Sequence, residues 1–549
     1  MSITILPNIN DIYSEEFYIH NKIRVNIKDI PLCLSNTFRR IVLSELPCVA
    51  FDDTWNDHES KRYITINKNN SGLHNEFLAH RLSLIPIHIY NNNTRDILKI
   101  KTMYNHTTQA REYQFNSEDI PIFHLYINAE KQLLKKESKN RYGLFEVTTH
   151  HIEYSSEYSS DIDCSEYFQP DLDIKEQFTE NEYIILNMLK SDEELDVSMK
   201  PTIGLPKHNS RYCSVGTIEF MFEQDETKFD DVFQQTIEYE NKERISKNLS
   251  RLNDSEIKIK HNSFMVLDKE RVYKKNKYDE PNSFNILIES IGVLPSHQIV
   301  FDALTILKLK LYDIIHSFNN FKQYSDQIIY DTDFSYENKI NVVHSIDNLY
   351  GYKIIIKNEN HTIGNTINYY MNTLFVKNYI TNEHVDLQDL HTIPPIDSSN
   401  IDLSQFRQPI LEQCGYKMPH PLKEEIEFKC KCRNDLSDEL INELYAKYSL
   451  ELKQIYNIQS SSDQRDISII DKQKIICIYI CVKSMLSIIE IISNLSSQWI
   501  EETTKVNHTI DTSSFIVGDT KEYFTFNHGV DETRSVIEQD ADADVEHLN

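Results

Sequence analysis

Apolar and polar positions follow the same two patterns in two distant parts of the chain. Apolar residues alternate with polar ones over residues 22–28, and they recur at helical spacing over residues 32–46. The same succession returns at residues 352–356 and 362–375. Alternation predicts a half-buried strand and helical spacing predicts an amphipathic helix, so each part is expected to contain a strand followed by a helix. Two copies of one small unit in a single chain suggest a pair that packs against itself.

The first copy belongs to a longer segment that polar intervals interrupt. Its further expected elements are strands at 63–66, 216–223 and 284–290 and helices at 76–85 and 296–317. Residues 97–199 are rich in Tyr, Ser and acidic residues, and we expect an insert domain made of loops rather than core. Residues 224–282 are a second polar excursion. The first domain is therefore expected to comprise residues 1–96 and 200–320.

The second copy is expected to follow a linker at residues 321–344. It forms a smaller domain over residues 345–505, with an insertion at 378–410. Its further expected elements are a strand at 425–432, a polar helical stretch to about residue 464 and a long amphipathic helix at 468–502. Residues 506–549 are polar and end in an acidic run, so we expect a disordered tail.

Charge and cysteine content narrow the class of protein. The chain of 549 residues has 57 Lys and Arg against 85 Asp and Glu, for a net charge of −28. Direct binding to duplex DNA requires clustered cations, so the composition favours basic protein partners instead. Nine cysteines without a regular framework indicate a reducing compartment. The N-terminus lacks a secretory signal, and the most apolar stretch, 475–482, is too short to span a bilayer. We therefore expect a soluble intracellular protein without a membrane partner.

Motifs for catalysis or cofactor binding are not found in the sequence. There is no Gly-rich phosphate loop, nucleophile elbow or HExxH motif. The run from Asp540 to Asp544 resembles a magnesium-binding carboxylate cluster, but it lies in a tail without an apolar framework. Cys430 with Cys432, and Cys477 with Cys481, could each supply half of a zinc site, or all four could form one. Core positions in a strand and a helix explain these cysteines with fewer assumptions, so we expect no catalytic residue, metal or cofactor.

Several segments resemble signatures of alpha-like subunits of DNA-directed RNA polymerase. Two are similar to the N-terminal signature, two to later parts of the larger eukaryotic and archaeal subunit, and two to the smaller subunit. In chain order they are Leu34–Phe51 (LSNTFRRIVLSELPCVAF), Glu76–Ile87 (EFLAHRLSLIPI), Ile203–His208 (IGLPKH) with Ser214–Val215, Phe284–Leu309, His361–Tyr370 (HTIGNTINYY) and Gly415–Leu422 (GYKMPHPL). Their order and spacing agree with both subunits.

This resemblance implies an α+β fold in which two alpha-like RNA polymerase dimerisation units pack as an intramolecular pseudo-dimer, with an inserted domain in the first unit. It implies a non-catalytic assembly platform that binds two large catalytic subunits and small adaptor subunits, and that meets DNA only through the complex. Fusion of the two subunits is typical of large double-stranded DNA viruses, which implies the viral particle and the cytoplasm or nucleus of infected cells. The larger cellular subunit often holds a zinc or iron–sulfur cluster in its insert, whereas residues 97–195 contain only Cys164.

Two alternatives stay open at this point. One is an acidic structural adaptor that has the alpha-like fold without belonging to a polymerase. The other is a metal-dependent enzyme that uses the scattered cysteines and histidines.

Candidate interface residues lie within the matched motifs. From spacing alone, Arg39 and Arg40 are a solvated pair, whereas the resemblance places their helix against the large subunits. His80, His361 and His420 are expected to be hydrogen-bonded structural residues. Thr362 is a candidate N-cap, and Gly364 permits close backbone approach at the start of its helix. The full set is Asn36, Phe38, Arg39, Arg40, Glu76, His80, Arg81, His361, Thr362, Gly364, Asn365, Tyr369 and His420. The helices at 32–46, 76–85, 296–317, 362–375 and 468–502 are expected to pack across the interface between the two units.

Overall fold

Helices and strands are both abundant in this computed structural model, which confirms the α+β class. The described part of the chain comprises residues 1–6, 22–56, 61–89, 98, 100–105, 110–115, 120–134, 144–155, 167–168, 183–276, 279–318, 320–324, 327–330, 339–345, 351–376, 410–458, 460–461, 467–505, 510 and 516–517. Residues 378–409 of the predicted insertion lie outside it, as do Cys164 and the run from Asp540 to Asp544.

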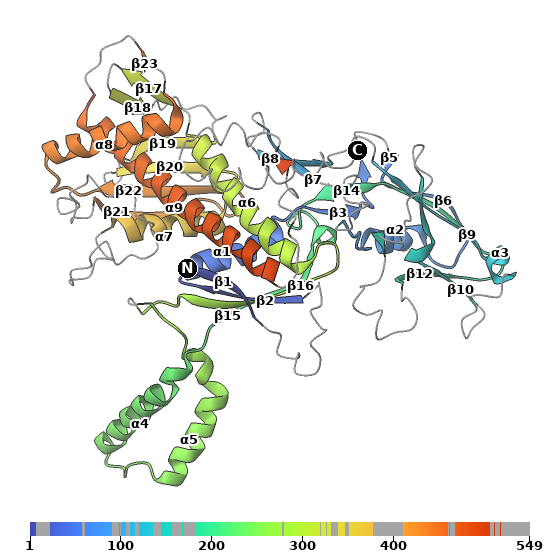
Figure 1. The fold of residues 1–549 in the computed structure, drawn as a ribbon, viewed down its shortest axis with the longest axis horizontal. Coiled ribbons are helices and arrows are strands. Elements are labelled where there is room, and N and C mark those ends of the chain that lie inside the picture. The colour runs from blue at the N-terminus through green and yellow to red at the C-terminus, as the bar shows by residue number, and fades with distance from the viewer. Residues whose placement is uncertain are drawn as a thin grey trace, which may run out of the picture.

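The first sheet forms around the strand predicted at residues 22–28. Its antiparallel strands run in the order β1-β2-β16-β15, and they are β1 (Ser2–Leu6), β2 (Lys22–Lys28), β15 (Val215–Phe222) and β16 (Ser283–Ser290). Val25 pairs with Ile5 on one side and with Ile286 on the other, so these apolar side chains share one face. Helices α1 (Leu32–Ser44) and α6 (Ser296–His316) pack on this sheet (Figure 1).

The second sheet has the same strand order as the first. Its antiparallel strands run β19-β20-β22-β21, and they are β19 (Ile340–Ser345), β20 (Gly351–Lys357), β21 (Leu411–Lys417) and β22 (Glu425–Cys432). Three helices accompany it: α7 (His361–Phe375), α8 (Asp438–Tyr456) and α9 (Ile469–Lys505). The predicted linker at 321–344 therefore overlaps with this sheet, because β19 begins at Ile340, and Ile340 and Val342 are both buried.

A strand, turn and helix recur in the two halves at a constant spacing of 329 positions. Strand β20 and the start of α7 are displaced by this spacing from β2 and the start of α1. The residue after each strand, Asp29 or Asn358, has a left-handed backbone with a φ of 59°. Asp and Asn tolerate this region better than most side chains, so the two turns have the same geometry for the same physical reason.

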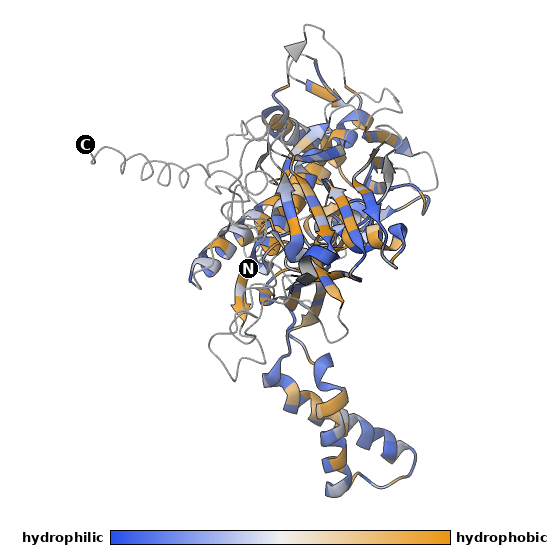
Figure 2. Ribbon diagram, turned by 90° about the vertical axis from the view of Figure 1, so that its right-hand side faces the viewer, coloured by the Kyte–Doolittle hydropathy of each residue, from blue (hydrophilic) through white to orange (hydrophobic). Residues whose placement is uncertain are grey.

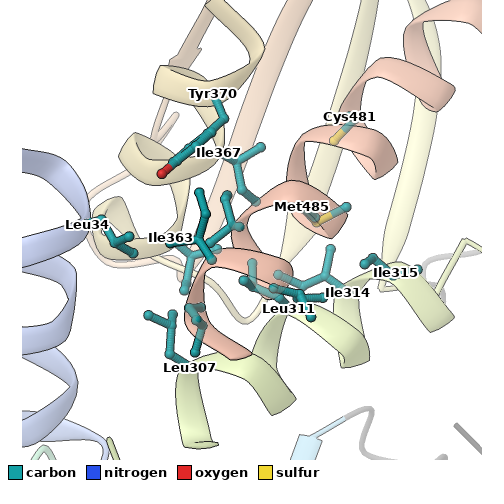
Figure 3. Close-up of a cluster of buried hydrophobic side chains, with 14 of the residues drawn as sticks. Leu34, Leu307, Leu311, Ile314, Ile315, Ile363, Ile367, Tyr370, Cys481 and Met485 are labelled. Atoms are coloured by element: carbon teal, nitrogen blue, oxygen red, sulfur yellow. The ribbon is translucent and has the colours of Figure 1, made fainter. Parts of the chain in front are cut away.

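One hydrophobic core runs through both halves. Helix α1 contacts α6 and α7, and α9 also contacts α6 and α7, so the four helices form a closed ring. Leu34, Leu311, Ile367 and Met485, one from each helix, belong to the same buried cluster (Figure 3). Four of the five helices expected at the interface between the halves are therefore in mutual contact.

Helix α9 passes over both sheets. It contacts β1 of the first sheet and β20 and β22 of the second. By length and composition alone this helix could cross a membrane, since the mean hydropathy of its most apolar window is 2.3. The apolar run is thus longer than the stretch at 475–482, because Lys474 and Lys483 do not end it. Within the fold, 83% of that window is buried, as in the core helix of a globular protein.

The described residues between Cys48 and Gly204 build a separate lobe beside the two sheets (Figure 1). Its elements are β3 (Cys48–Phe51), β4 (Trp55–Asn56), β5 (Lys61–Arg62), β6 (Ile64–Asn69), α2 (Asn75–Ser83), β7 (Ile100–Asn105), β8 (Ala110–Phe115), β9 (Ile122–Asn128), α3 (Ala129–Leu134), β10 (Phe145–Thr148), β11 (Ile152–Ser155), β12 (Ile185–Leu189), β13 (Glu194–Met199) and β14 (Pro201–Gly204). Strands β11-β9-β13-β6 form its largest sheet.

This lobe corrects two expectations about the insert. It has its own buried core, in which Phe51, Phe123, Tyr167 and Phe168 are in ring contact, rather than loops alone. The buried residues of β6 and α2, such as Leu78, also belong to this core and not to that of the first sheet, although they come before residue 96. The polar sequence between the strands concealed a core whose residues come from several short strands.

Two further segments differ from the expected linker and tail. Strands β17 (Phe321–Tyr324) and β18 (Gln327–Tyr330) form a small sheet with β23 (Ser460–Ser461). Strand β24 (Ile516–Val517) pairs in parallel with β7, so part of the segment that we expected to be a disordered tail has a defined strand.

The excursion at 224–282 contains a helical hairpin that projects from the first sheet (Figures 1 and 2). Helices α4 (Phe229–Ser246) and α5 (Asp254–Leu267) pack through Phe233 and Phe264. Asn253 caps α5, and its side chain accepts a hydrogen bond from the backbone N–H of Glu256. Short 3-10 helices lie at Thr149–His151, Ser210–Tyr212, Glu226–Lys228 and Lys269–Arg271.

Candidate assembly interface

The helices α1 and α7 meet at two equivalent threonines. Thr37 and Thr366 follow an asparagine in each copy of the repeat, and their hydroxyl oxygens lie 2.7 Å apart in the buried interior. The Thr37 hydroxyl also lies 3.0 Å from the carbonyl oxygen of Thr362, which accepts its hydrogen bond. Contact between equivalent residues is the mark of a two-fold arrangement, because the axis must pass between them.

A chain of alternating charges also links the two halves. Lys310 of α6 lies 3.5 Å from Glu45, at the end of α1, and 3.4 Å from Glu359, which precedes α7. Glu359 lies 3.6 Å from Lys339, at the start of the second sheet. Burial alone would lower the pKa of Lys310, but the charges of Glu359 and Glu45 raise it above the usual lysine value. The lysine is therefore charged, and the chain Glu45–Lys310–Glu359–Lys339 is an ionic connection that is buried at Glu359 and Lys339 and partly exposed at Lys310 and Glu45.

Polar side chains anchor helices of the second half to the first. The indole N–H of the fully buried Trp499, near the end of α9, donates to the backbone carbonyl of His297 at 2.9 Å. Tyr456 at the end of α8 donates to the carbonyl of Ile315 at 2.8 Å, and Tyr369 of α7 donates to Glu280 at 3.2 Å. The contacts at His297 and Ile315 fix both ends of α6 against the second half.

Several candidate interface residues are part of the interior. Phe38 and Thr362 are buried, and Gly364 packs so closely against the ring of Tyr416 that an added Cβ would lie 2.9 Å from it. The expected N-cap at Thr362 is wrong, because the Asn360 side chain accepts the hydrogen bond from the Thr362 N–H. These residues shape the contact between helices and are not available to a partner protein.

Arg39 and Arg40 have different environments. Arg39 is half-buried, donates two hydrogen bonds to Asn36 and lies 6.0 Å from the centre of the Phe220 ring. Arg40 is exposed, so the two arginines are not an equivalent solvated pair. Successive helix positions differ by about 100° in direction, and this difference turns one side chain toward β15 and the other toward solvent.

The positive charge of Arg40 acts on a half-buried group of the second half. Burial raises the pKa of Tyr416, and the charge of Arg40 opposes that rise. The ring of His361 lies 3.4 Å from the Tyr416 hydroxyl. Asn365 and His420 are also exposed, and the His420 ring accepts a hydrogen bond from the N–H of Leu422 within its own turn. Thus α1, the start of α7 and β21 together form one mixed polar surface.

The candidate residues on α2 lie on a different part of the molecule. The expectation that this helix packs between the halves is wrong, because α2 contacts β3, β6 and β12 of the separate lobe. Glu76, His80 and Arg81 are exposed, and Arg81 donates to the carbonyl of Ile185 at 2.7 Å. The apolar residues of α2 that face inward, such as Leu78, are buried in the core of this lobe.

Two apolar residues complete this surface of α2. Phe77 is 68% exposed and Leu84 is 52% exposed. With His80 and Arg81 they follow the i, i+3, i+4, i+7 spacing of one helix face. Sequence reasoning missed them because the inward stripe through Leu78 and Leu82 accounted for the helical period. A large aromatic residue outside that stripe was the signal available.

The cysteines of the second half are buried in pairs from different elements. Cys432 lies 3.7 Å from Cys477, and Cys414 lies 3.9 Å from Cys430, measured between sulfur atoms. Burial raises the pKa of the Cys481 thiol, which therefore stays protonated. Within the described residues, no group of three or more His, Cys, Asp or Glu side chains has the arrangement of a metal site. These thiols act as small apolar groups in the core.

A protein-family model and several known proteins match part of this chain. The model of the RNA polymerase Rpb3/Rpb11 dimerisation domain matches residues 24–311, which is more than half of the chain. The DNA-directed RNA polymerases IV and V subunit 3B of Arabidopsis thaliana is 22% identical over 318 residues, which cover 55% of this chain and 90% of that protein. The DNA-directed RNA polymerase subunit Rpo3 of Methanocaldococcus jannaschii is 42% identical over 57 residues, or 10% of this chain and 25% of that protein.

A third relative, the DNA-directed RNA polymerase II subunit RPB3 of Schizosaccharomyces pombe, is 37% identical over 67 residues, or 12% of this chain and 19% of that protein. The family match begins in β2 and ends within α6, so it includes β15, β16 and most of β2 from the first sheet, together with α1 and most of α6. The chain belongs to the family of alpha-like RNA polymerase subunits that the Rpb3/Rpb11 dimerisation domain defines.

Proposed function

We propose that this chain is a fused pair of alpha-like units that closes on itself as an intramolecular pseudo-dimer. The observation that carries the proposal is the repeat spaced by 329 positions, whose two helices meet at equivalent residues, Thr37 and Thr366. The shared strand order of the two sheets and the common core of α1, α6, α7 and α9 support it. Fusion makes the pairing intramolecular, with an effective concentration on the order of millimolar for a flexible tether.

An engineered cross-link tests this closure. In Thr37→Cys with Thr366→Cys, the two new thiols are expected to form a disulfide under mild oxidation, because the native hydroxyls are 2.7 Å apart. The product is a monomer with faster mobility on a non-reducing gel, and reduction restores its normal mobility. Each single variant is the control, since it keeps the same native cysteines. Equal mobility of the double and single variants after oxidation contradicts the closed arrangement.

We further propose that the closed pair is a non-catalytic assembly platform of a DNA-directed RNA polymerase. Two large catalytic subunits and small adaptor subunits are the proposed partners, and DNA is met through the complex. The names of the relatives and the net charge of −28, which disfavours direct binding to duplex DNA, support this proposal.

Large double-stranded DNA viruses carry such fusions, so we propose the viral particle and the infected cell as the location of this protein. A membrane contact is not proposed, because 83% of the most apolar window of α9 is buried within the fold.

Two exposed surfaces are proposed to bind the large subunits. One is the mixed polar surface formed by Arg40, His361, Asn365 and His420, and the other is the α2 face formed by Glu76, Phe77, His80, Arg81 and Leu84. Aromatic and arginine side chains dominate the energetics of protein interfaces, and both surfaces present an arginine. They belong to different cores, so each surface can be altered without changing the other.

Charge reversal at each surface tests these docking sites. Arg40→Glu and Arg81→Glu are each expected to reduce the amount of large subunits that co-purify with the tagged chain by about tenfold, because a reversed charge at an interface repels the complementary partner. Arg251→Glu, at an exposed arginine on the helical hairpin, is the matched control and is expected to leave recovery unchanged. Full recovery with both test variants contradicts these docking sites. Absence of polymerase subunits from the unmodified chain favours an adaptor outside a polymerase.

A further inference from the structure

The two halves present nearly interchangeable surfaces at their contact. They share the strand order, the strand-turn-helix repeat and an Asn-Thr pair in the second turn of α1 and of α7. A second copy of the chain therefore offers two competing arrangements, in which a first half pairs with a first half or a second half with a second half. The threonine contact does not discriminate against them, because one hydroxyl can bond to another in every combination.

The charge chain distinguishes the halves where the threonines do not. Glu359 is the residue after the left-handed Asn358, and the equivalent residue after Asp29 is Ile30. Both positions are buried, but Ile30 contributes to the hydrophobic core whereas Glu359 reaches Lys310 of the other half. The repeat thus has a carboxylate on one side of the contact and an alkyl group on the other.

We propose that the Lys310–Glu359 ion pair is the specificity determinant that makes the first half select the second half and reject another copy of itself. This inference rests on the proposed pseudo-dimer. In a pairing of two first halves, Lys310 faces Ile30 and keeps only the carboxylate of Glu45. In a pairing of two second halves, Glu359 loses Lys310 and keeps only Lys339. Each wrong pairing breaks the central link of the buried chain and leaves its charges less compensated in a dry environment.

The burial of these groups makes the discrimination effective. The side chain of Glu359 is 3% exposed and that of Lys310 is 16% exposed, so solvent cannot replace the missing partner of Glu359. A surface ion pair would be screened by water and salt and would discriminate weakly between the two pairings.

The flanking charges restrict which substitutions of Lys310 and Glu359 are informative. Exchanging Lys310 and Glu359 would place like charges beside Glu45 and Lys339, so neutral substitutions are the better test.

A cysteine reporter at the axis measures which halves pair. In Thr37→Cys, the new thiol faces Thr366 when the chain closes correctly, and no new cross-link forms. When two first halves pair, the reporter faces its own copy, and oxidation gives a covalent dimer on a non-reducing gel. When the first half of one copy pairs with the second half of another, no new cross-link forms, because the reporter thiol at position 37 still faces a Thr366. The chain without the reporter, oxidised in parallel, gives the background of the native cysteines.

Substitution of Glu359 is the test in this reporter background. Glu359→Ile copies the residue of the first half, and Glu359→Gln keeps the shape while it removes the charge. Both variants of the full-length chain are expected to raise the covalent dimer about tenfold over the reporter alone. Asp313→Asn is the matched control, because it weakens a buried ion pair on the same helix with Arg111 of the separate lobe. It is expected to leave the dimer at the reporter level.

The outcomes separate this inference from the proposed function. A dimer that stays at the reporter level in both Glu359 variants, while Thr37→Cys with Thr366→Cys still closes within one chain, overturns the specificity role and leaves the pseudo-dimer intact. An equal rise in Asp313→Asn also overturns it, because loss of stability would then explain the dimer. Failure of the intrachain cross-link in the otherwise unmodified chain overturns the pseudo-dimer and this inference with it.

Discussion

Trp499→Ala is expected to lower the free energy of unfolding by about 3–5 kcal/mol, the range for removing a buried Trp or Phe side chain. Trp499 is fully buried, belongs to the core common to both halves and donates to the carbonyl of His297. The substitution leaves a cavity between α9 and the first half and removes a hydrogen bond across that contact. Urea denaturation, followed by far-ultraviolet circular dichroism, measures the change.

Trp499→Phe is the control that separates packing from hydrogen bonding. It keeps an aromatic ring in the site but removes the indole N–H. We therefore expect the free energy of unfolding to fall by about 1 kcal/mol for the lost hydrogen bond, and by a packing cost smaller than that of the alanine variant. A change below about 1 kcal/mol for the alanine variant would contradict the anchoring of α9 on the first half, since core truncations of this size exceed that value.

Asp313→Ala is expected to lower the free energy of opening of the separate lobe by about 3–5 kcal/mol, because removing one partner of a buried ion pair leaves the charge of the other uncompensated. Two hydrogen bonds of 2.6 and 2.9 Å join Asp313 of α6 to Arg111 of β8. The two side chains are only 5% and 7% exposed. Hydrogen exchange should increase at the amides of β7 and β8, while the amides of β20 and β22 keep their protection.

A double variant tests whether the charge or the shape of this contact matters. Arg111→Met with Asp313→Leu removes both charges, and we expect it to recover most of the loss, because apolar replacement of a buried ion pair is often neutral. If the double variant is as labile as Asp313→Ala, the contact depends on hydrogen bonds that Arg111 makes to other groups, such as Thr102. Unchanged exchange in Asp313→Ala would contradict the anchoring role.

Local sequence pattern predicted the elements of the two sheets well. The alternation at 22–28 and the helical spacing at 32–46 correspond to β2 and α1, and the pattern at 352–356 and 362–375 corresponds to β20 and α7. These assignments succeeded because a one-sided apolar face has a period that the backbone geometry fixes. The long helix at 468–502 was also predicted within a few residues of α9.

The separate lobe and the candidate surfaces were predicted less well. Its strands are short, and their buried residues, such as Phe123 and Tyr167, are isolated in polar sequence. Such a core exists only after strands distant in the sequence pair, so no local period reveals it. The same limit applies to α2. The helix was predicted from its motif, but its packing against β12 could not be predicted, because that strand lies far away in the sequence. Arg39 and Arg40 are neighbours in sequence, and only the position of β15 decided which of them is exposed.

The sequence by itself determined the α+β class, the repeated strand-turn-helix unit and the resemblance to alpha-like subunits. Each of these depends on periodicity or on short signatures, which are local properties of the sequence. Only the tertiary structure decided that Leu78 and Leu82 join the core of the lobe, that Thr37 meets Thr366 and that Lys310 meets Glu359. Burial and ion pairing depend on which surfaces approach each other across hundreds of residues. That choice belongs to the folded chain as a whole, since each contact forms only when the others position it.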